Sequence, residues 1–259
     1  MTASRRGQSV HDPFFSSDMP REGLNQISTR WPLIQDPVKF VMRYAPAIQG
    51  YLGVFLKNPH DVEDVCQVFL LRVVERGLVE KTAIHGRFRD YLIASVRNAA
   101  LAHLRRKATT TLEIERLAQV PAEAGPEFPA DEEWIAGWRK VVLTSVWEAL
   151  ENHQNDNPGS LNYSTLRTLV DHPQETSTQL AERVSRLCGR IVQPAAFRKQ
   201  VSRGRRLFAE LLVAEIARTL ENATPLRIEE ELIDIGVMKY VQPFLPPDWR
   251  TSGELRDAD

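Results

Sequence analysis

The feature that most constrains this fold is the spacing of apolar residues, which recur at intervals of three and four along most of the chain. A clear example begins after Asp36, where the apolar positions are Val38, Val41, Met42, Ala45, Ile48 and Leu52. Alternation at every second residue, the pattern of a half-buried strand, is scarce. The sequence therefore predicts an all-α fold, and we expect Pro46 to kink or break the first helix.

Further helices are predicted from apolar spacing and from residues typical of helix ends. The expected ranges are residues 60–77, 88–106, 132–151, 163–171, 177–187, 194–220 and a short acidic helix over 229–235. Pro194 suits the first position of the longest of these helices, because a proline there loses no helical hydrogen bond. Gly189 lies between the stretches 177–187 and 194–220 and predicts a turn.

Changes in composition divide these helices into two groups. Residues 108–131 contain clustered Pro, Ala and Gly, which favours a linker. Residues 1–27 are mixed and polar, and we interpret them as a flexible N-terminal arm. The sequence thus predicts two helical domains, residues 28–107 and 132–220, followed by a C-terminal tail over residues 221–259. The apolar part of this tail, residues 237–245, is expected either to fold back on the second domain or to be ordinary core packing.

Composition and motifs argue against several classes of protein. Lys and Arg number 33 and Asp and Glu 34, so a protein that coats DNA through net positive charge is excluded. The two cysteines form no paired motif, and the six histidines have no metal-ligand spacing. Phosphate loops, nucleophile elbows and zinc-protease motifs are missing from the sequence. We therefore predict no enzyme activity, no catalytic residue, no metal and no cofactor.

The chain also shows no apolar run of about 18–20 residues that could span a bilayer. The residues after Arg5 and Arg6 are polar, where a signal peptide would be apolar. We expect a cytoplasmic protein that does not associate with membranes.

Two basic clusters suggest contact with nucleic acid. The first has Phe88 and Tyr91 interleaved with Arg87, Arg89, Arg97, Arg105, Arg106 and Lys107. Cations bind phosphates and aromatic rings stack on unpaired bases, although the alternative is solvated arginines beside core aromatics. The second cluster follows the turn at Gly189 and comprises Arg198, Lys199, Arg203, Arg205 and Arg206. This order is typical of a helix-turn-helix, or else of two helices in an ordinary bundle.

Several motifs resemble region 2 of bacterial sigma factors of the sigma-70 superfamily, extracytoplasmic-function type. Residues 61–70, DVEDVCQVFL, resemble the region 2.2 signature D-A-E-D-x-x-Q-x-x-F-L with one residue fewer before the Phe. Residues 43–47 resemble the opening helix of region 2. Residues 86–92, 97–98 and 104–106 resemble regions 2.3 and 2.4. Residues 180–211 are similar to region 4, and residues 214–232 resemble the ends of large planctomycete-type members.

The resemblance implies three groups of site residues. The residues expected to bind core RNA polymerase, at the clamp helices of its β′ subunit, are Asp61, Asp64, Gln67, Phe69 and Arg72. Those expected on the −10 side of promoter DNA are Arg87, Phe88, Arg89, Tyr91, Arg97, Asn98, Arg105 and Arg106. Residues 78–89 fall on the loop that captures a flipped base. Those expected on the −35 side are Arg198, Lys199, Ser202, Arg203 and Arg206.

The function that the resemblance implies is promoter recognition and initiation of transcription by core RNA polymerase, and an anti-sigma factor is a further partner that it allows. The family has Asp where Ala102 stands and Trp where Tyr91 stands. Because of these differences, promoter melting is the step that the resemblance supports least. Two other functions remain open. One is a helix-turn-helix regulator that binds DNA without polymerase. The other is a degenerate sigma-like protein that serves as an interaction module.

Overall fold

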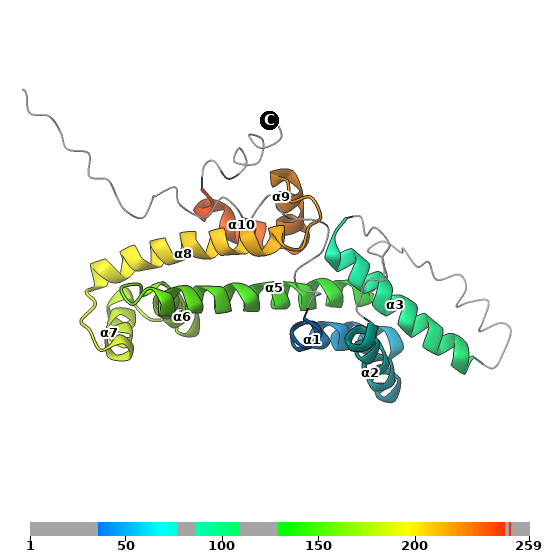
Figure 1. Ribbon diagram of the computed structural model, residues 1–259. Coiled ribbons are helices and arrows are strands. Elements are labelled where there is room, and N and C mark those ends of the chain that lie inside the picture. Colours follow the sequence, from blue (N-terminus) through cyan, green and yellow to red (C-terminus); the bar gives the residue numbers. More distant parts are fainter. Residues whose placement is uncertain (1–35, 77–85, 109–128, 247–248, 250–259) are drawn as a thin grey trace, which may run out of the picture. The chain divides into compact units, whose positions relative to one another are not determined.

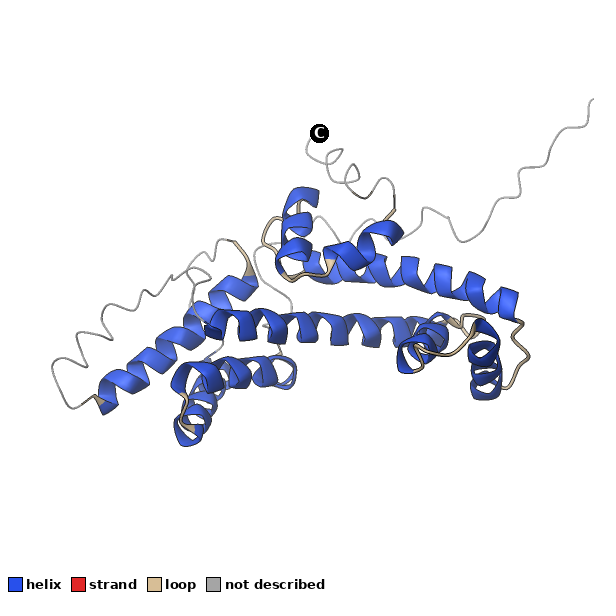
Figure 2. Cartoon of the chain, turned by 180° about the vertical axis from the view of Figure 1, so that it is seen from behind, coloured by secondary structure: helices blue, strands red, loops and turns tan. Residues whose placement is uncertain are grey.

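Helices account for most of the part of the chain that the computed structural model describes, which is residues 36–76, 86–108, 129–246 and 249. The predicted arm over 1–27 and most of the predicted linker lie outside these residues. The helices are α1 (Pro37–Leu56), α2 (Pro59–Arg76), α3 (Phe88–Lys107), α5 (Pro129–Asp156), α6 (Asn162–Asp171), α7 (Ser177–Cys188), α8 (Pro194–Ala217), α9 (Pro225–Asp234), α10 (Met238–Val241) and the 3₁₀ turn η3 (Gln242–Phe244). Figure 2 shows no strand in this part of the chain, which confirms the all-α prediction.

Of the kink or break expected at Pro46, the break does not occur, and that part of the prediction was wrong. Helix α1 continues through Pro46. The proline ring is exposed, while Tyr44, Ala47 and Ile48 on either side of it are buried. Packing of these neighbours therefore holds both halves of the helix against the core despite the missing hydrogen bond. At its start, the Asp36 carboxylate accepts hydrogen bonds from two backbone amides and caps the helix.

Helix α5 is longer than predicted at both ends. Its first residues, 129–131, belong to the stretch interpreted as linker. It packs against α1, and it also packs against α6 and α8 (Figure 1). One helix thus contacts elements of both predicted domains.

An aromatic cluster forms the centre of the larger core. The Tyr44 ring of α1 stacks on the Trp138 ring of α5, with centroids 5.5 Å apart and planes 12° from parallel. Phe88 of α3 meets both rings edge-on or tilted. The same apolar core continues to buried residues of α8, α9 and α10. Residues from both predicted domains and from the tail therefore share one core, and the division into two domains stays a prediction.

Two glycines allow helices to cross closely. A Cβ added at Gly137 of α5 would lie 3.1 Å from the Cβ of Ala47 in α1. A Cβ added at Gly204 of α8 would lie 2.9 Å from Leu166 Cγ and 3.2 Å from the Asn162 carbonyl oxygen, both in α6. An added Cβ would displace its neighbours at Gly204 and would press on Ala47 at Gly137, so both crossings depend on the missing side chain.

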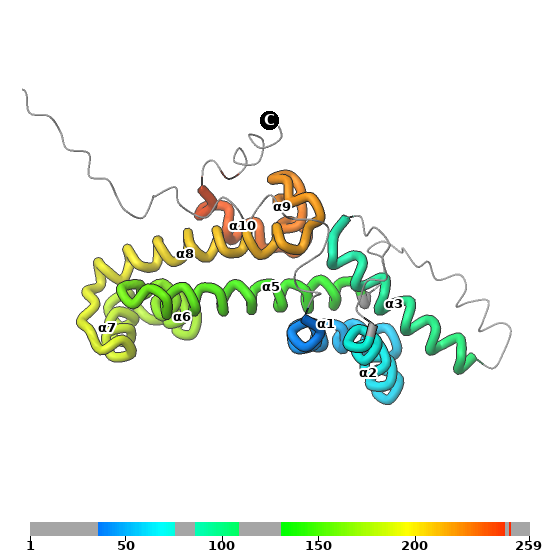
Figure 3. Tube along the Cα trace, viewed as in Figure 1, coloured from blue at the N-terminus to red at the C-terminus, as the bar shows by residue number. Residues whose placement is uncertain are grey.

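Helices α6, α7 and α8 enclose a second, smaller core, which consists of Leu161, Leu180, Ala181, Val184 and Phe197. Thr176 and Gln179 form a capping box at the start of α7, and Gly189 ends that helix in the left-handed conformation. The Ser185 hydroxyl accepts a hydrogen bond from the Val192 amide across the turn to α8. Figure 3 shows the resulting order of helix, turn and long helix.

The C-terminal tail folds back on the preceding helices. Val237, Met238 and Val241 are buried in the larger core. Farther along, the Arg205 guanidinium of α8 lies over the Phe244 ring, 5.3 Å from its centroid. Of the two expectations for residues 237–245, core packing describes the first part, and contact with α8 describes the end.

Candidate functional site

The outward face of α2 carries most of the residues expected to bind polymerase. Val62, Val65, Phe69 and Val73 are buried and turn one side of α2 to the core. Asp64, Gln67 and Arg72 are exposed on the remaining surface. Val68 and Leu71 on this surface are 51% and 57% exposed. An acid, an amide and large apolar side chains thus share one accessible helix face.

Asp61 and Phe69 differ from the rest of that group because both are buried. The Asp61 carboxylate accepts a hydrogen bond from Lys107 Nζ at 2.6 Å, and His103 Nε2 lies 2.9 Å away. Both partners belong to α3. Hydrogen bonds from Lys107 and His103 hold the pKa of Asp61 below its usual value. In this arrangement Asp61 joins the start of α2 to the end of α3.

A pocket of about 300 Å³ lies between α2 and α3. Its α2 wall includes four of the predicted polymerase residues, namely Asp64, Gln67, Phe69 and Arg72. Its α3 wall includes Ala102, His103 and Arg106. The structure therefore brings Arg106, expected on the DNA side, next to the polymerase group. Because Ala102 lacks a carboxylate, it leaves this wall without the acid that the resemblance led us to expect.

Two residues predicted to contact DNA are parts of the core. Phe88 is buried in the aromatic cluster. Arg97 is buried as well, and its guanidinium donates hydrogen bonds to the Tyr51 hydroxyl at 2.8 Å and to Asp131 Oδ1 at 2.5 Å. A buried guanidinium needs such partners, since an unpaired charge in the core is very costly. The expectation that Phe88 and Arg97 bind DNA stays a prediction, and in this structure both have internal partners.

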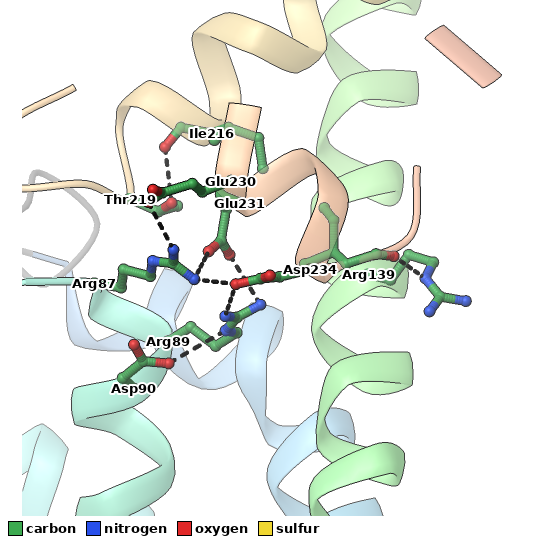
Figure 4. A network of polar contacts seen from close by, with 10 residues as sticks. Arg87, Arg89, Asp90, Arg139, Ile216, Thr219, Glu230, Glu231 and Asp234 are labelled. Atoms are coloured by element: carbon green, nitrogen blue, oxygen red, sulfur yellow. Dashed lines mark hydrogen bonds and ion pairs between the residues drawn. The ribbon is translucent and has the colours of Figure 1, made fainter. Parts of the chain in front are cut away.

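Arg87 and Arg89, at the start of α3, face an acidic group on α9 (Figure 4). Arg87 pairs with Asp234, with Glu230 at 3.3 Å and with Glu231 at 3.2 Å. Arg89 pairs with Glu231 at 3.2 Å and Asp234 at 3.4 Å. We call Glu230, Glu231 and Asp234 the acidic clamp.

The rest of α3 remains more accessible. Asn98, Arg105 and Arg106 are exposed, and Tyr91 is half-buried against the larger core. Of the residues expected on the −10 side, these lie outside the acidic clamp and the buried Arg97 pair. Asn98 and Arg105 are seven residues apart, close to two helical turns, and therefore lie on nearly the same side of α3.

All five residues expected on the −35 side are exposed on α8. Their spacing places them in two adjacent stripes. Lys199, Arg203 and Arg206 form one stripe. Arg198 and Ser202 form the other and line a pocket of about 340 Å³ that also includes Arg205 and Phe244. The first stripe is an open row of cations, whereas Phe244 of the tail lines the same pocket as the second stripe.

Sequence reasoning missed two features of these surfaces. The sequence analysis gave Val68 and Leu71 no role, and only the burial of Val65, Phe69 and Val73 shows that these two side chains lie on the exposed face. The acidic clamp was visible as an acidic run over residues 229–235. Its position against α3 depends on how the tail folds, so no local pattern signals it.

Among the described residues, no cluster of three or more His, Cys, Asp or Glu side chains could hold a metal ion. In the same part of the chain, no helix is long and apolar enough to cross a membrane.

Comparison with known families agrees with this geometry for the first three helices. Residues 40–110 match the family described as Sigma-70 region 2. The match includes most of α1 and all of α2 and α3, with the pocket between α2 and α3. No curated protein and no solved structure gives a significant match to the chain.

Proposed function

We propose that this protein is a sigma factor, which binds core RNA polymerase and directs promoter recognition and transcription initiation in the cytoplasm. The observation that carries the proposal is the match of residues 40–110 to Sigma-70 region 2. In our proposal, α2 contacts the clamp helices of the β′ subunit, α3 faces the −10 element and α8 faces the −35 element.

The physical character of α2 supports a protein partner. Scattered exposed apolar residues are ordinary, but Val68 and Leu71 lie beside each other on one helix face. They are flanked by Asp64 and Gln67, whose carboxylate and amide suit a basic helical partner. A small apolar centre with polar neighbours is the usual composition of a protein interface.

The DNA part of the proposal rests on the accessible cations. On α3 these are Arg105 and Arg106, and on α8 they are Lys199, Arg203 and Arg206. Each phosphate that a cation neutralises releases counterions and adds to affinity at low salt. For Phe88 and Arg97 we propose a structural role instead, since both are buried with internal partners.

The proposal is tested by changing the centre of the α2 face. Leu71→Asp should fold, because Leu71 is 57% exposed. It places a charge in the centre of the interface, and we expect affinity for core RNA polymerase to fall at least about tenfold. Binding of the labelled full chain to purified core enzyme measures this change directly.

Val170→Asp is the matched control, because Val170 is 56% exposed on α6, far from α2 in the sequence. It adds the same charge to an equally exposed apolar position. We expect it to bind core polymerase as the parent does. Equal binding by Leu71→Asp and the parent would show that this face of α2 does not contact core polymerase. If the parent itself does not bind core polymerase, the sigma-factor proposal is rejected.

A further inference from the structure

The segment that enters α3 is covered by a distant part of the chain. The Phe88 amide donates a hydrogen bond to the Thr219 carbonyl at 3.1 Å, and the Glu221 amide donates to the Gly86 carbonyl at 3.3 Å. The Gly86 amide in turn donates to the Glu221 carboxylate at 2.9 Å. Arg87 and Leu220 form an isolated bridge between these segments. The chain before α9 is therefore fastened to the chain before α3.

The acidic clamp extends this contact through side chains. Its carboxylates hold both guanidinium groups at the start of α3, as Figure 4 shows. The Arg87 side chain is 22% exposed and the Arg89 side chain 6%. Neither arginine is open to a large ligand while α9 stays in this position.

We propose that α9 is a built-in competitor of nucleic acid, which occupies Arg87 and Arg89 until it moves away from α3. This inference rests on the proposed function in one respect only, namely that the nucleic acid is promoter DNA. Carboxylate and phosphate oxygens are interchangeable partners for a guanidinium group, because both accept paired, charge-assisted hydrogen bonds. A DNA strand at the start of α3 must therefore displace the acidic clamp.

The inner side of α9 is anchored in the larger core by Ile228 and Leu232, whereas most of the clamp's ion pairs are open to solvent. Glu230 and Asp234 are half-exposed, with side chains 50% and 43% accessible, so solvent screens their pairs with the arginines. Only Glu231 is fully buried. Leu226 and Ile233 on the outer side of α9 are exposed, so this helix is not enclosed on that side. Loss of the three ion pairs that these two half-exposed carboxylates form would weaken the contact without leaving Glu231 unpaired.

The test uses the full chain with Glu230→Gln and Asp234→Asn together. The probe is a fluorescein-labelled single-stranded DNA of mixed sequence, and anisotropy at low ionic strength gives the affinity. We expect the double variant to bind about 3- to 10-fold more tightly than the parent, since the three screened ion pairs of Glu230 and Asp234 no longer compete. Addition of Arg87→Gln to the double variant should remove most of that gain.

The matched control is Glu132→Gln with Asp156→Asn, which removes two exposed acids from α5 and changes net charge equally. We expect it to bind DNA within about twofold of the parent, since nonspecific attraction changes little with two distant charges. An equal gain in the control, or no gain in the clamp variant, would overturn the proposal.

Hydrogen exchange gives a second measurement that needs no variant. Excess oligonucleotide should speed amide exchange in residues 225–234 of the parent if α9 leaves α3 on binding. Unchanged or slower exchange there would contradict displacement. Core polymerase binding is measured separately, so the two ideas can fail independently. A clamp variant without a DNA effect rejects the clamp alone, and a parent that never binds polymerase rejects the sigma-factor proposal alone.

Discussion

The carboxylate of Asp61 has a local role that its position in a signature motif did not reveal. It accepts a hydrogen bond from Lys107 and lies within hydrogen-bond distance of His103, two residues of α3. These bonds favour the ionised form, so the pKa of Asp61 is lowered from 3.8. A lowered pKa in the folded state contributes stability above the unfolded pKa, and that stability is lost as pH falls through the folded value.

We therefore predict that Asp61→Asn destabilises the protein at neutral pH and that the difference from the parent shrinks below about pH 4. Urea unfolding followed by circular dichroism at several pH values measures the difference in midpoint. Asp64→Asn is the control, because Asp64 is an exposed acid of the same helix. A difference between Asp61→Asn and parent that stays constant down to the lowest pH would show that the Asp61 charge contributes nothing.

At the scale of elements, the crossing of α6 and α8 depends on the missing side chain at Gly204. An added Cβ would meet Leu166 Cγ and the Asn162 carbonyl oxygen closer than ordinary contacts. Alanine favours a helix over glycine by about 1 kcal/mol, but overpacking a crossing costs about 1–3 kcal/mol. We predict that Gly204→Ala lowers the free energy of unfolding by about 1 kcal/mol.

Gly53→Ala is the matched control, because Gly53 is a helical glycine of α1 with nothing within 4 Å of an added Cβ. It should stabilise the protein by about 0.5–1 kcal/mol. Denaturant unfolding of both variants measures whether each substitution raises or lowers the free energy of unfolding. A stabilising Gly204→Ala would mean that α6 and α8 do not cross as closely as described.

At the scale of the whole molecule, α5 connects the two halves that sequence composition separates. Trp134 and Trp138 belong to the core with α1 and α3, while Trp147 meets Phe208 of α8 with ring centroids 5.2 Å apart. A core shared in this way couples the unfolding of its parts. We predict one cooperative transition, with coincident midpoints by tryptophan fluorescence and circular dichroism.

A buried substitution in the smaller core sharpens this prediction. Val184→Ala removes apolar packing between α7 and its neighbours. It should lower the free energy of unfolding by about 1–3 kcal/mol, so that the midpoints by both probes fall together. Two separate unfolding transitions, with only one midpoint lowered by Val184→Ala, would instead indicate two independent domains.

Helix positions could be predicted from the sequence because apolar spacing and capping residues act locally. Ser177 and Pro194, for example, begin α7 and α8 where sequence patterns place them. Continuity through Pro46 could not be predicted, since it depends on burial of the flanking residues in a core made by other helices.

The arginines in the first half of α3 and just before it show the same limit at the candidate site. From the sequence alone, these arginines are predicted to be cations available to DNA. Their partners Asp131 and Glu231 lie 34 and more than 100 residues away in the chain, and only the tertiary fold brings them together.

We propose that this chain directs core RNA polymerase to promoters. The most direct test is run-off transcription by purified core enzyme on a pool of genomic fragments, with and without the full chain. We predict transcripts with new, discrete start sites that require the added protein and that are lost with Leu71→Asp. The absence of any new start site, despite a folded protein and active core enzyme, would contradict it.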